Sequence, residues 1–536
     1  MPVDIIDAII QQQSQESSPM YLTQFLHKAV REYPNDEAVV FGDRRQTWAQ
    51  LCDRIARLAG VMQTLGMGEG DRVGILGLNS DRYMETVFAA LWGGGVFNTV
   101  NIRWSAPEIA YSLDDCDTRI LFVDDEFAPL VPTIREKSAS LHTVVYMGEG
   151  QAPAGTEELG ALMDNASPVA DAERHGDDLA GILYTGGTTG KPKGVMLSHG
   201  NLYLSALSTV IPACRRDRIV GLHSAPFFHV AGIGLIVQLA IRGGTHVILP
   251  RFEPLPVIEA ISRENVKETF LVPTMLRAVL DHPGFDNHDT SSLRCLIYGA
   301  SPMDSTLLKR AMDKLPNADF LQMYGMTELS PTVTMLLPEV HADPARHDKL
   351  MTAGSPTHIA EIRIVDPMDN EVKRGQVGEI CARGPMVMQG YWNKEQQTRE
   401  AIRDGWMHTG DAGYMDDDGY VFLVDRIKDM IVTGGENVYS VEVEDVLLQC
   451  PEIAQCAVIG VPDEKWGERV HAVVVLKDGR ELDEAAVTNF CKEHIAGYKC
   501  PRSYEVREEL PMSGAGKLLK FKLKEEHWKG RGRNIG

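Results

Sequence analysis

Short apolar runs alternate along this chain with longer stretches in which apolar residues recur every three or four positions. The runs are rich in Val, Ile and Leu and predict strands, and the periodic stretches predict helices. Strands separated by helix-length segments favour parallel sheets covered by helices. Before about residue 350 we expect strands at 72–78, 119–125, 142–148, 179–185, 245–250, 268–274 and 294–300, and helices at 46–65 and 305–314.

The pattern changes after about residue 350. Short runs such as EIRIVD, GEICAR and GYVFLVD are joined by turns such as DDDG, which predicts a small antiparallel β subdomain. Beyond Lys428, the runs QCAVIGVP and HAVVVLKDG and a helical stretch over 483–495 predict a compact α+β fold. We therefore predict an α/β chain. Its large N-terminal domain, 1–427, has two parallel-type sheets with helices plus the β subdomain, and a small α+β domain follows over 428–536.

Charge narrows the classes of partner. The 536 residues carry a formal net charge of −22, which disfavours general electrostatic binding to nucleic acid or to an anionic membrane. Residues 517–533 reverse this locally, with seven Lys or Arg against two Glu. We expect that tail to form a solvated face, apart from the lysine that opens it.

The cysteines and the apolar runs indicate in which cellular compartment the protein is expected. The nine cysteines include no C-x-x-C pair, which predicts neither a disulfide framework nor a zinc site and favours a reducing cytoplasm. The longest apolar run, 230–241, is too short to span a membrane and contains Gln238. An acidic residue, Asp4, stands where a signal peptide needs positive charge. We expect a cytoplasmic protein without a membrane span.

The segment YTGGTTGKPKGVMLSHGN, residues 184–201, has the chemistry of a phosphate cradle. Glycines let backbone N–H groups approach an anion, threonine hydroxyls add donors, and two lysines add charge. The segment is not a Walker P-loop, because Pro192 stands where that motif needs Ser or Thr. The chain then enters the strand-like run GVMLS, so we expect a hairpin loop. Its residues are Thr185, Gly186, Gly187, Thr188, Thr189 and Gly190, followed by Lys191 and Lys193.

Two later segments add nucleotide chemistry. QMYGMTE, residues 322–328, offers Tyr324 to stack on a purine, Thr327 to donate to a phosphate, and Glu328 as an oxygen ligand for Mg²⁺. YGASP, residues 298–302, ends a strand at a tight turn, where parallel sheets bind ligands. Met303 rules out the G-x-S-x-G elbow of hydrolases. Each segment alone is also typical of an ordinary turn.

The glycine–threonine loop resembles the phosphate-binding signature of the adenylate-forming (ANL) superfamily. That superfamily includes acyl-CoA and aryl-CoA synthetases, luciferases and peptide-synthetase adenylation domains. Its further landmarks follow in family order and spacing as APFFH (225–229), YGASP, QMYGMTE, WMHTGD (406–411), DR (425–426), TGGEN (433–437) and GAGK (514–517). The chain departs from the family at Gly186, usually Ser, and at Ser440, often Pro.

The resemblance implies a role for each matching residue. It makes Lys517, Glu328, Thr185 and His229 catalytic, with Mg²⁺ on Glu328, and Lys428 the hinge of a mobile C-terminal domain. The residues that would bind ATP or AMP are Thr185, Gly186, Gly187, Thr188, Thr189, Gly190, Lys193, Gly299, Ala300, Ser301, Met323, Tyr324, Gly325, Met326, Thr327, Asp411 and Arg426. Those that would contact coenzyme A are Gly434, Gly435, Glu436, Trp466 and Arg103.

The resemblance also implies an acyl pocket, in which His229 borders the substrate carboxylate. Its lining would be Phe228, His229, Val230, Gly232, Val272, Pro273, Thr274, Gly299, Met323, Gly325, Met326 and Pro331. No lysine or arginine in this set could pair a second carboxylate, so the set favours an apolar monoacid, and we lean to a medium-chain fatty acid. Methionine adapts to several shapes, so some tolerance is expected.

These observations predict an AMP-forming acid–CoA ligase. ATP and Mg²⁺ would activate the acid as an acyl-adenylate with release of pyrophosphate, and CoA would then displace AMP. An aryl or arylalkyl acid–CoA ligase and adenylation for a carrier protein stay open as alternatives. Amino-acid activation needs an acidic partner for the ammonium, which APFFHVAG lacks. A non-enzymatic nucleotide sensor would have no use for Glu328 and Lys517, so these residues argue against that alternative. The sequence leaves open whether the protein forms a homodimer.

Overall fold

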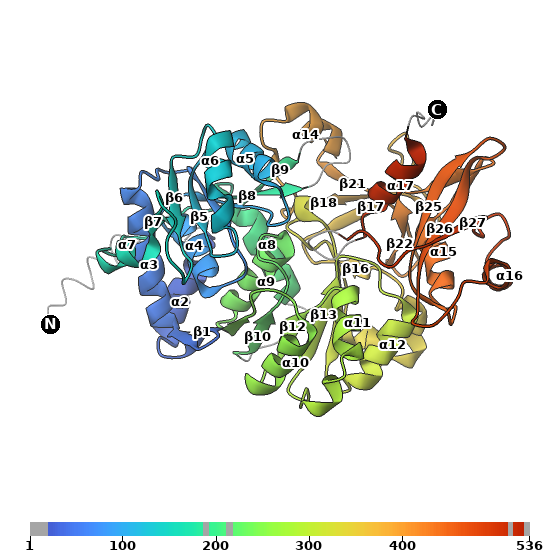
Figure 1. The fold of residues 1–536 in the computed structure, drawn as a ribbon, viewed down its shortest axis with the longest axis horizontal. Helices are drawn as coiled ribbons and strands as arrows, with labels where there is room; N and C mark the ends of the chain where they lie inside the picture. Colours follow the sequence, from blue (N-terminus) through green and yellow to red (C-terminus); the bar gives the residue numbers. More distant parts are fainter. Residues whose placement is uncertain (1–19, 186–191, 211–217, 513–517, 530–536) are drawn as a thin grey trace.

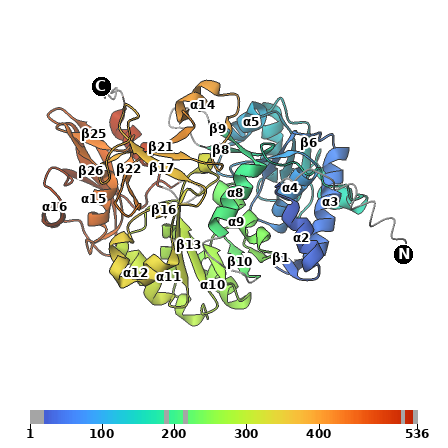
Figure 2. The ribbon, with the colours of Figure 1, turned by 180° about the vertical axis from the view of Figure 1, so that it is seen from behind.

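The computed structural model describes residues 20–185, 192–210, 218–512 and 518–529. In Figure 1 the first sheet, in blue and cyan, lies at one end of the molecule, and the orange and red C-terminal segments lie at the other. The helices α8 and α9 stand between the first sheet and the green strands of the second, and the reverse view in Figure 2 shows the same order. No helix among the described residues is long and apolar enough to cross a membrane.

The first sheet has eight strands among the described residues. Most neighbours are parallel, as predicted, and β9 runs antiparallel to both β8 and β19. Across the sheet the strands are β19 (Gly390–Tyr391), β9 (Lys193–Ser198), β8 (Leu179–Thr185), β4 (Val96–Thr99), β3 (Arg72–Leu76), β5 (Thr118–Val123), β6 (Thr143–Tyr146) and β7 (Glu157–Glu158).

The second sheet has nine strands among the described residues. Its central strands are parallel, and antiparallel pairs close both edges. In order the strands are β16 (Ser355–Pro356), β15 (Thr334–Leu336), β14 (Asp319–Tyr324), β13 (Cys295–Gly299), β12 (Glu268–Phe270), β10 (Val220–His223), β11 (Thr245–Ile248), β1 (Glu37–Phe41) and β2 (Arg44–Thr47).

Helices cover these sheets because each presents an apolar stripe. In α3 (Trp48–Thr64), Leu51, Ile55, Leu58 and Met62 are all buried, and a capping box of Thr47 and Gln50 closes the N-terminal end. The other helices of this part are α2 (Gln24–Glu32), α4 (Asp81–Trp92), α5 (Ala106–Asp115), α6 (Val131–Lys137), α7 (Leu159–Asp164), α8 (His199–Val210), α9 (Val230–Ile241), α10 (Pro254–Arg263), α11 (Pro273–Asp281), α12 (Ser305–Lys314), α13 (Pro338–Ala342) and α14 (Glu395–Ala401). The described residues also form the 3₁₀ turns η1 (Ala128–Leu130), η2 (Phe285–Asn287), η3 (Thr327–Leu329) and η4 (Pro344–Lys349).

Two smaller sheets are present in the part of the chain that the structure describes. The predicted antiparallel subdomain is confirmed as β17 (Glu361–Val365), β18 (Gly378–Arg383), β20 (Ile402–Arg403), β21 (Trp406–Met415) and β22 (Val421–Arg426). The C-terminal sheet consists of β23 (Ile431–Thr433), β24 (Glu436–Val438), β25 (Ile453–Asp463), β26 (Gly467–Leu476) and β27 (Ser503–Val506). Its helices are α15 (Ser440–Leu447), α16 (Glu484–His494) and α17 (Lys520–Trp528).

The C-terminal sheet has a core of its own. Val458 of β25 and Val470 of β26 pack with Leu447 of α15 and Cys491 of α16, and all four are buried. This agrees with the α+β fold predicted beyond Lys428.

Two predictions about local structure are wrong. The run 268–274 is a strand only as far as Phe270, because Pro273 opens α11, where a proline without an N–H is well tolerated. The basic tail is not uniformly solvated either. Lys520 and Lys524 are only 11% and 15% exposed and pair with Glu444 and Asp429. Lys522 and Lys529 are exposed as expected.

Candidate active site

The glycine–threonine loop joins β8 to β9 in an antiparallel hairpin, as the sequence predicted. Thr185 and Lys193 are opposite each other in the ladder and form its last described pair. Gly186, Gly187, Thr188, Thr189, Gly190 and Lys191 lie outside the described residues. The base of the hairpin is fixed by Asp115 of α5. Its Oδ2 accepts a hydrogen bond of 2.8 Å from the Tyr184 hydroxyl, and its carbonyl accepts one of 2.9 Å from Trp392 Nε1.

Lys193 and Glu328 are linked through Tyr391. The Lys193 ammonium lies 4.1 Å from the centroid of the Tyr391 ring, a cation–π distance. The Tyr391 hydroxyl donates a hydrogen bond of 2.9 Å to Glu328 Oε1. Burial and the neighbouring carboxylate raise the pKa of Tyr391, so its proton stays on the phenol. A cation from the hairpin and a carboxylate from η3 are thereby held around one aromatic ring.

Glu328 has the properties of a Mg²⁺ ligand. It follows Thr327 in η3, its residue is only 6% exposed, and its backbone carbonyl accepts from the Met388 N–H at 2.9 Å. A buried carboxylate that Tyr391 links to the Lys193 cation offers the oxygen ligand that Mg²⁺ prefers. Met326 precedes η3 and Pro331 follows it.

The ends of β13 and β14 lie side by side, with Gly299 opposite Met323 in a parallel pair. A Cβ on Gly299 would lie 2.1 Å from the Met323 carbonyl oxygen, and one on Gly325 would lie 1.8 Å from the Pro331 carbonyl oxygen. Only glycine allows these approaches. Ala300 has a φ of +64°, so the turn that carries Ser301 leaves the strand sharply. The predicted adenine-side residues therefore gather at one strand edge.

Asp411 of β21 is held by two side chains. The Tyr324 hydroxyl, at the end of β14, donates a hydrogen bond of 2.7 Å to Asp411 Oδ2. Arg426 of β22 is paired with Asp411 in the ladder, and its Nε lies 3.2 Å from Oδ1. Burial and the Asp411 carboxylate raise the pKa of Tyr324. The residues predicted for the adenosine thus come together from two different sheets.

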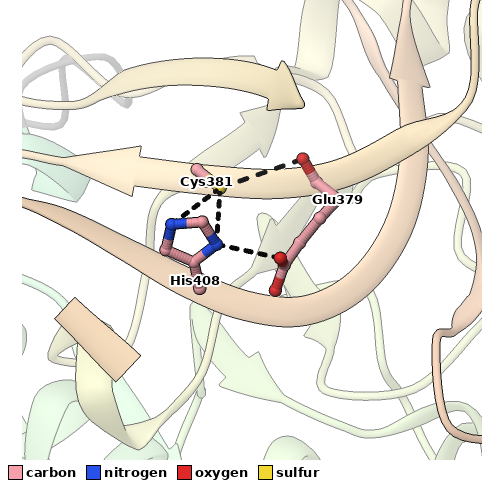
Figure 3. A group of neighbouring side chains, drawn as sticks. All are labelled: Glu379, Cys381 and His408. Atoms are coloured by element: carbon pink, nitrogen blue, oxygen red, sulfur yellow. Dashed lines mark hydrogen bonds and ion pairs between the residues drawn. The ribbon is translucent and has the colours of Figure 1, made fainter. Parts of the chain in front are cut away.

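A group that sequence reasoning missed supports the β-bulge of β21 that contains Asp411. Figure 3 shows Glu379 and Cys381 of β18 beside His408 of β21. His408 Nδ1 donates to Glu379 Oε2 at 2.8 Å, and the Gly410 N–H donates to Glu379 Oε1 at 3.0 Å. Cys381 Sγ lies 3.3 Å from His408 Nδ1. Glu379 therefore holds both His408 and Gly410, the two ends of the segment just before Asp411. No local sequence motif predicted this role.

The residues predicted to line an acyl pocket occur at four places. Phe228 and His229 precede α9. His229 is half-buried, and the centroid of its ring lies 4.8 Å from that of the Phe228 ring. Val230 and Gly232 lie in α9, Val272 precedes α11, and Pro273 and Thr274 open it. The remaining members are Gly299, Met323, Gly325, Met326 and Pro331 at the strand edge described above.

Most residues predicted for coenzyme A cluster on the C-terminal sheet. Gly434 and Gly435 form the turn between β23 and β24, both with positive φ, and Glu436 opens β24. The Gly434 N–H donates to the Trp466 carbonyl at 2.8 Å, and the Arg502 guanidinium lies 4.4 Å from the Trp466 ring centroid. Arg103 is exposed ahead of α5, and no hydrogen bond or ion pair of the described residues joins it to this cluster.

The segment around Lys428 joins the two parts of the chain. Lys428 is exposed between β22 and β23, and partial desolvation together with the nearby Arg426 holds the pKa of its ammonium below the usual value. Asp425, before it, accepts a hydrogen bond of 2.7 Å from the Ser440 hydroxyl, after it. Lys517 lies outside the described residues.

Comparisons with known proteins show which sequences and structures this chain resembles. The sequence matches the AMP-binding enzyme family over residues 26–392 and the AMP-binding enzyme C-terminal domain over 442–517. It is 38% identical over 501 residues to the feruloyl-CoA synthase of an Amycolatopsis species, covering 93% of this chain and 97% of that protein. It is 35% identical over 537 residues to the medium/long-chain-fatty-acid–CoA ligase FadD8 of Mycobacterium tuberculosis, covering 97% and 92%. The structure of the anthranilate CoA ligase AuaEII in complex with anthranoyl-AMP superposes with a TM-score of 0.87 at 27% identity, covering 96% and 98%.

Proposed function

This chain belongs to the AMP-binding enzyme family of adenylate-forming enzymes, and on that premise we propose that it ligates a carboxylic acid to coenzyme A through an acyl-adenylate. The observation that carries the proposal is the link from Lys193 through Tyr391 to the buried Glu328. In the proposal, Lys193 binds phosphate and Glu328 binds Mg²⁺, and the approach of both side chains to the Tyr391 ring supports these roles. Both are needed where two anions, ATP and a carboxylate, must react.

The first half-reaction joins the acid to the nucleotide. A carboxylate oxygen attacks the α-phosphorus of ATP, the bond from that phosphorus to the bridging oxygen breaks, and pyrophosphate leaves. The 185–193 hairpin holds the β- and γ-phosphates, Asp411 accepts from the ribose hydroxyls, and Lys517 stabilises the charge that develops on the α-phosphate. Glu328 would hold Mg²⁺, which neutralises phosphate charge when bound.

The second half-reaction transfers the acyl group. The CoA sulfur attacks the acyl carbon, its proton passes to solvent, and the bond to AMP breaks. We propose that residues 428–536 rotate about Lys428 between the two steps, which withdraws Lys517 and brings Gly434–Glu436 to the acyl group. Because Asp425 and Ser440 lie on either side of Lys428, this rotation changes their hydrogen bond.

The substrate we favour is an apolar monoacid, first a medium-chain fatty acid and next an aryl or arylalkyl acid. No Lys, Arg, Asp or Glu occurs among the proposed pocket residues, so a second charge on the acid would stay unpaired. The relatives named above include a feruloyl, a fatty-acid and an anthranilate ligase. A pyrophosphate-release screen over fatty acids of graded length and aromatic acids decides between the classes.

The decisive variant for the mechanism is Lys517→Ala, with the exposed Lys522→Ala as its matched control. It should abolish pyrophosphate release from acid and ATP but leave thioester formation from supplied acyl-AMP and CoA near the wild-type rate. Equal loss of both half-reactions would contradict the role of Lys517. A different result would be a wild-type enzyme that releases pyrophosphate without consuming CoA and forms a thioester only when a carrier protein is added. That result would favour the carrier-protein alternative. We propose a cytoplasmic enzyme, in keeping with its cysteine usage.

A further inference from the structure

Two histidines and a glutamate converge in the C-terminal domain, outside the site described above. His471 lies on β26, Glu505 on β27 and His527 in the last turn of α17. Glu505 Oε2 lies 3.7 Å from His471 Nε2 and 3.6 Å from His527 Nε2. The two imidazole rings meet edge to face, with centroids 4.9 Å apart. Three different elements therefore point a ligand atom at the same small space.

The distances are unusual for hydrogen bonds. Both exceed the reach of an N–H···O bond, and both Nε2 atoms are buried without a hydrogen-bond partner among the described residues. The His471 residue is only 5% exposed. A buried polar nitrogen without a partner is costly, and native proteins rarely leave two of them side by side. Something that accepts both lone pairs would remove that cost.

A metal ion has the dimensions required. Zinc binds imidazole nitrogen and carboxylate oxygen at about 2.0–2.2 Å with tetrahedral angles, which sets neighbouring ligand atoms roughly 3.4 Å apart. The observed separations of 3.7 and 3.6 Å are close to that spacing. Two imidazoles and one carboxylate also match the ligand preference of zinc, and they leave a fourth position for water.

The surrounding residues orient these ligands. His471 Nδ1 is 2.8 Å from Ser503 Oγ, and with Nδ1–H donating to that hydroxyl, Nε2 keeps its lone pair. Arg507 Nε donates to Glu505 Oε1, which leaves Oε2 for the histidines. Arg507 also bonds Glu526, so its charge is shared between two carboxylates. Arg469 is a further cation close to His471.

We propose that His471, Glu505 and His527 form a site for a divalent transition-metal ion, with zinc the best fit. The spacing of the cysteines could not predict this site, because none of its three ligands is a cysteine. The bound ion would tie α17 to β26 and β27, and so hold the segment that follows Lys517 against the C-terminal sheet. The group Glu379, Cys381 and His408 in Figure 3 differs, because His408 Nδ1 there already has a carboxylate acceptor at 2.8 Å.

The test is zinc binding by the full-length protein after treatment with EDTA. Equilibrium dialysis should give one tightly bound Zn²⁺ per chain for the wild type, and a loss of at least about 100-fold in affinity for His471→Gln and His527→Gln. The exposed His494→Gln, on α16 of the same domain, is the matched control and should bind like the wild type. Ser503→Ala should weaken binding about 10- to 100-fold, because it frees the orientation of His471.

Two further measurements separate a built site from incidental binding. Co²⁺ in the wild type should give the intense visible absorption of four-coordinate cobalt, and hydrogen exchange in 520–528 should slow on adding zinc. Neither effect should occur in His527→Gln, whose metal-free thermal unfolding should match that of the metal-free wild type. Zinc affinity unchanged by both histidine variants, or no tight zinc in the wild type, would overturn the proposal.

Discussion

Lys520 Nζ lies 2.7 Å from Glu444 Oε1, and the two side chains are only 11% and 14% exposed. The same ammonium donates to the Ser440 hydroxyl, which donates to Asp425. Burial alone would lower the pKa of Lys520, but Glu444 and Asp425 together outweigh it, and the pKa lies above its usual value. This buried pair anchors the start of α17, three residues after Lys517.

The first prediction follows from that pair. Lys520→Ala leaves the Glu444 carboxylate buried without its cation, which should lower the free energy of unfolding by about 3–5 kcal/mol. The exposed Lys522→Ala, on the same helix, should change it by less than about 0.5 kcal/mol. Urea unfolding followed by circular dichroism measures both. Equal stability of the two variants would show that the pair contributes nothing.

Tyr391 should matter for nucleotide activation. Tyr391→Phe keeps the ring beneath Lys193 but removes the hydrogen bond to Glu328, which should lower kcat/KM for Mg-ATP roughly 10- to 100-fold. Pyrophosphate release at varied Mg-ATP is the measurement. Tyr414→Phe is the control, since no hydrogen bond of its hydroxyl occurs among the described residues and its ring stacks on Phe422. Identical kinetics for both variants would count against the orientation of Glu328 by Tyr391.

Glu379 should act on the nucleotide through Asp411. Glu379→Gln keeps the shape of the side chain but weakens the hydrogen bonds from His408 and Gly410, so the β-bulge that contains Asp411 loosens. KM for ATP should rise several-fold while KM for the acid stays unchanged. Glu361→Gln, an exposed residue on the neighbouring strand β17, should leave both values as in the wild type. A rise confined to the acid KM would contradict this role.

Stability should fall in acid because of a buried histidine pair. His223 Nε2 lies 3.0 Å from His246 Nδ1, and burial lowers the pKa of His223 to about 3 and that of His246 well below its usual value. In the unfolded chain both take up a proton near pH 6.5, so the unfolded state binds more protons below that pH. The contribution of the pair is complete above about pH 6.5 and is lost as pH falls toward about 3.

The corresponding experiment measures the free energy of unfolding between pH 7 and pH 5. His246→Gln should reduce its slope by up to about 1.4 kcal/mol per pH unit, because one fewer buried imidazole must be kept neutral. The exposed His142→Gln should leave the slope as in the wild type. A slope unaffected by His246→Gln would mean that other groups govern acid stability.

Local pattern was enough to predict the layout of this chain. Apolar runs of strand length separated by amphipathic stretches predicted parallel sheets, the antiparallel subdomain after residue 350 and the final α+β fold. Glycines and polar residues at strand ends predicted where phosphate chemistry would lie, because backbone freedom and donor type are properties of the residues themselves. The error at residues 271–274 arose because an apolar run serves a strand and a buried helix start equally well.

Only the tertiary structure decided which side chains reach one another. Tyr391 and Glu328 are 63 residues apart, Tyr324 and Asp411 are 87 apart, and in both pairs the residues lie on different sheets or turns. Lys520 belongs to a tail whose charge pattern predicts solvation, yet it is buried because Glu444 meets it there. The approach of His471, Glu505 and His527 has the same cause. Local sequence determines propensity and charge, whereas a site depends on packing that brings distant segments within a few ångströms.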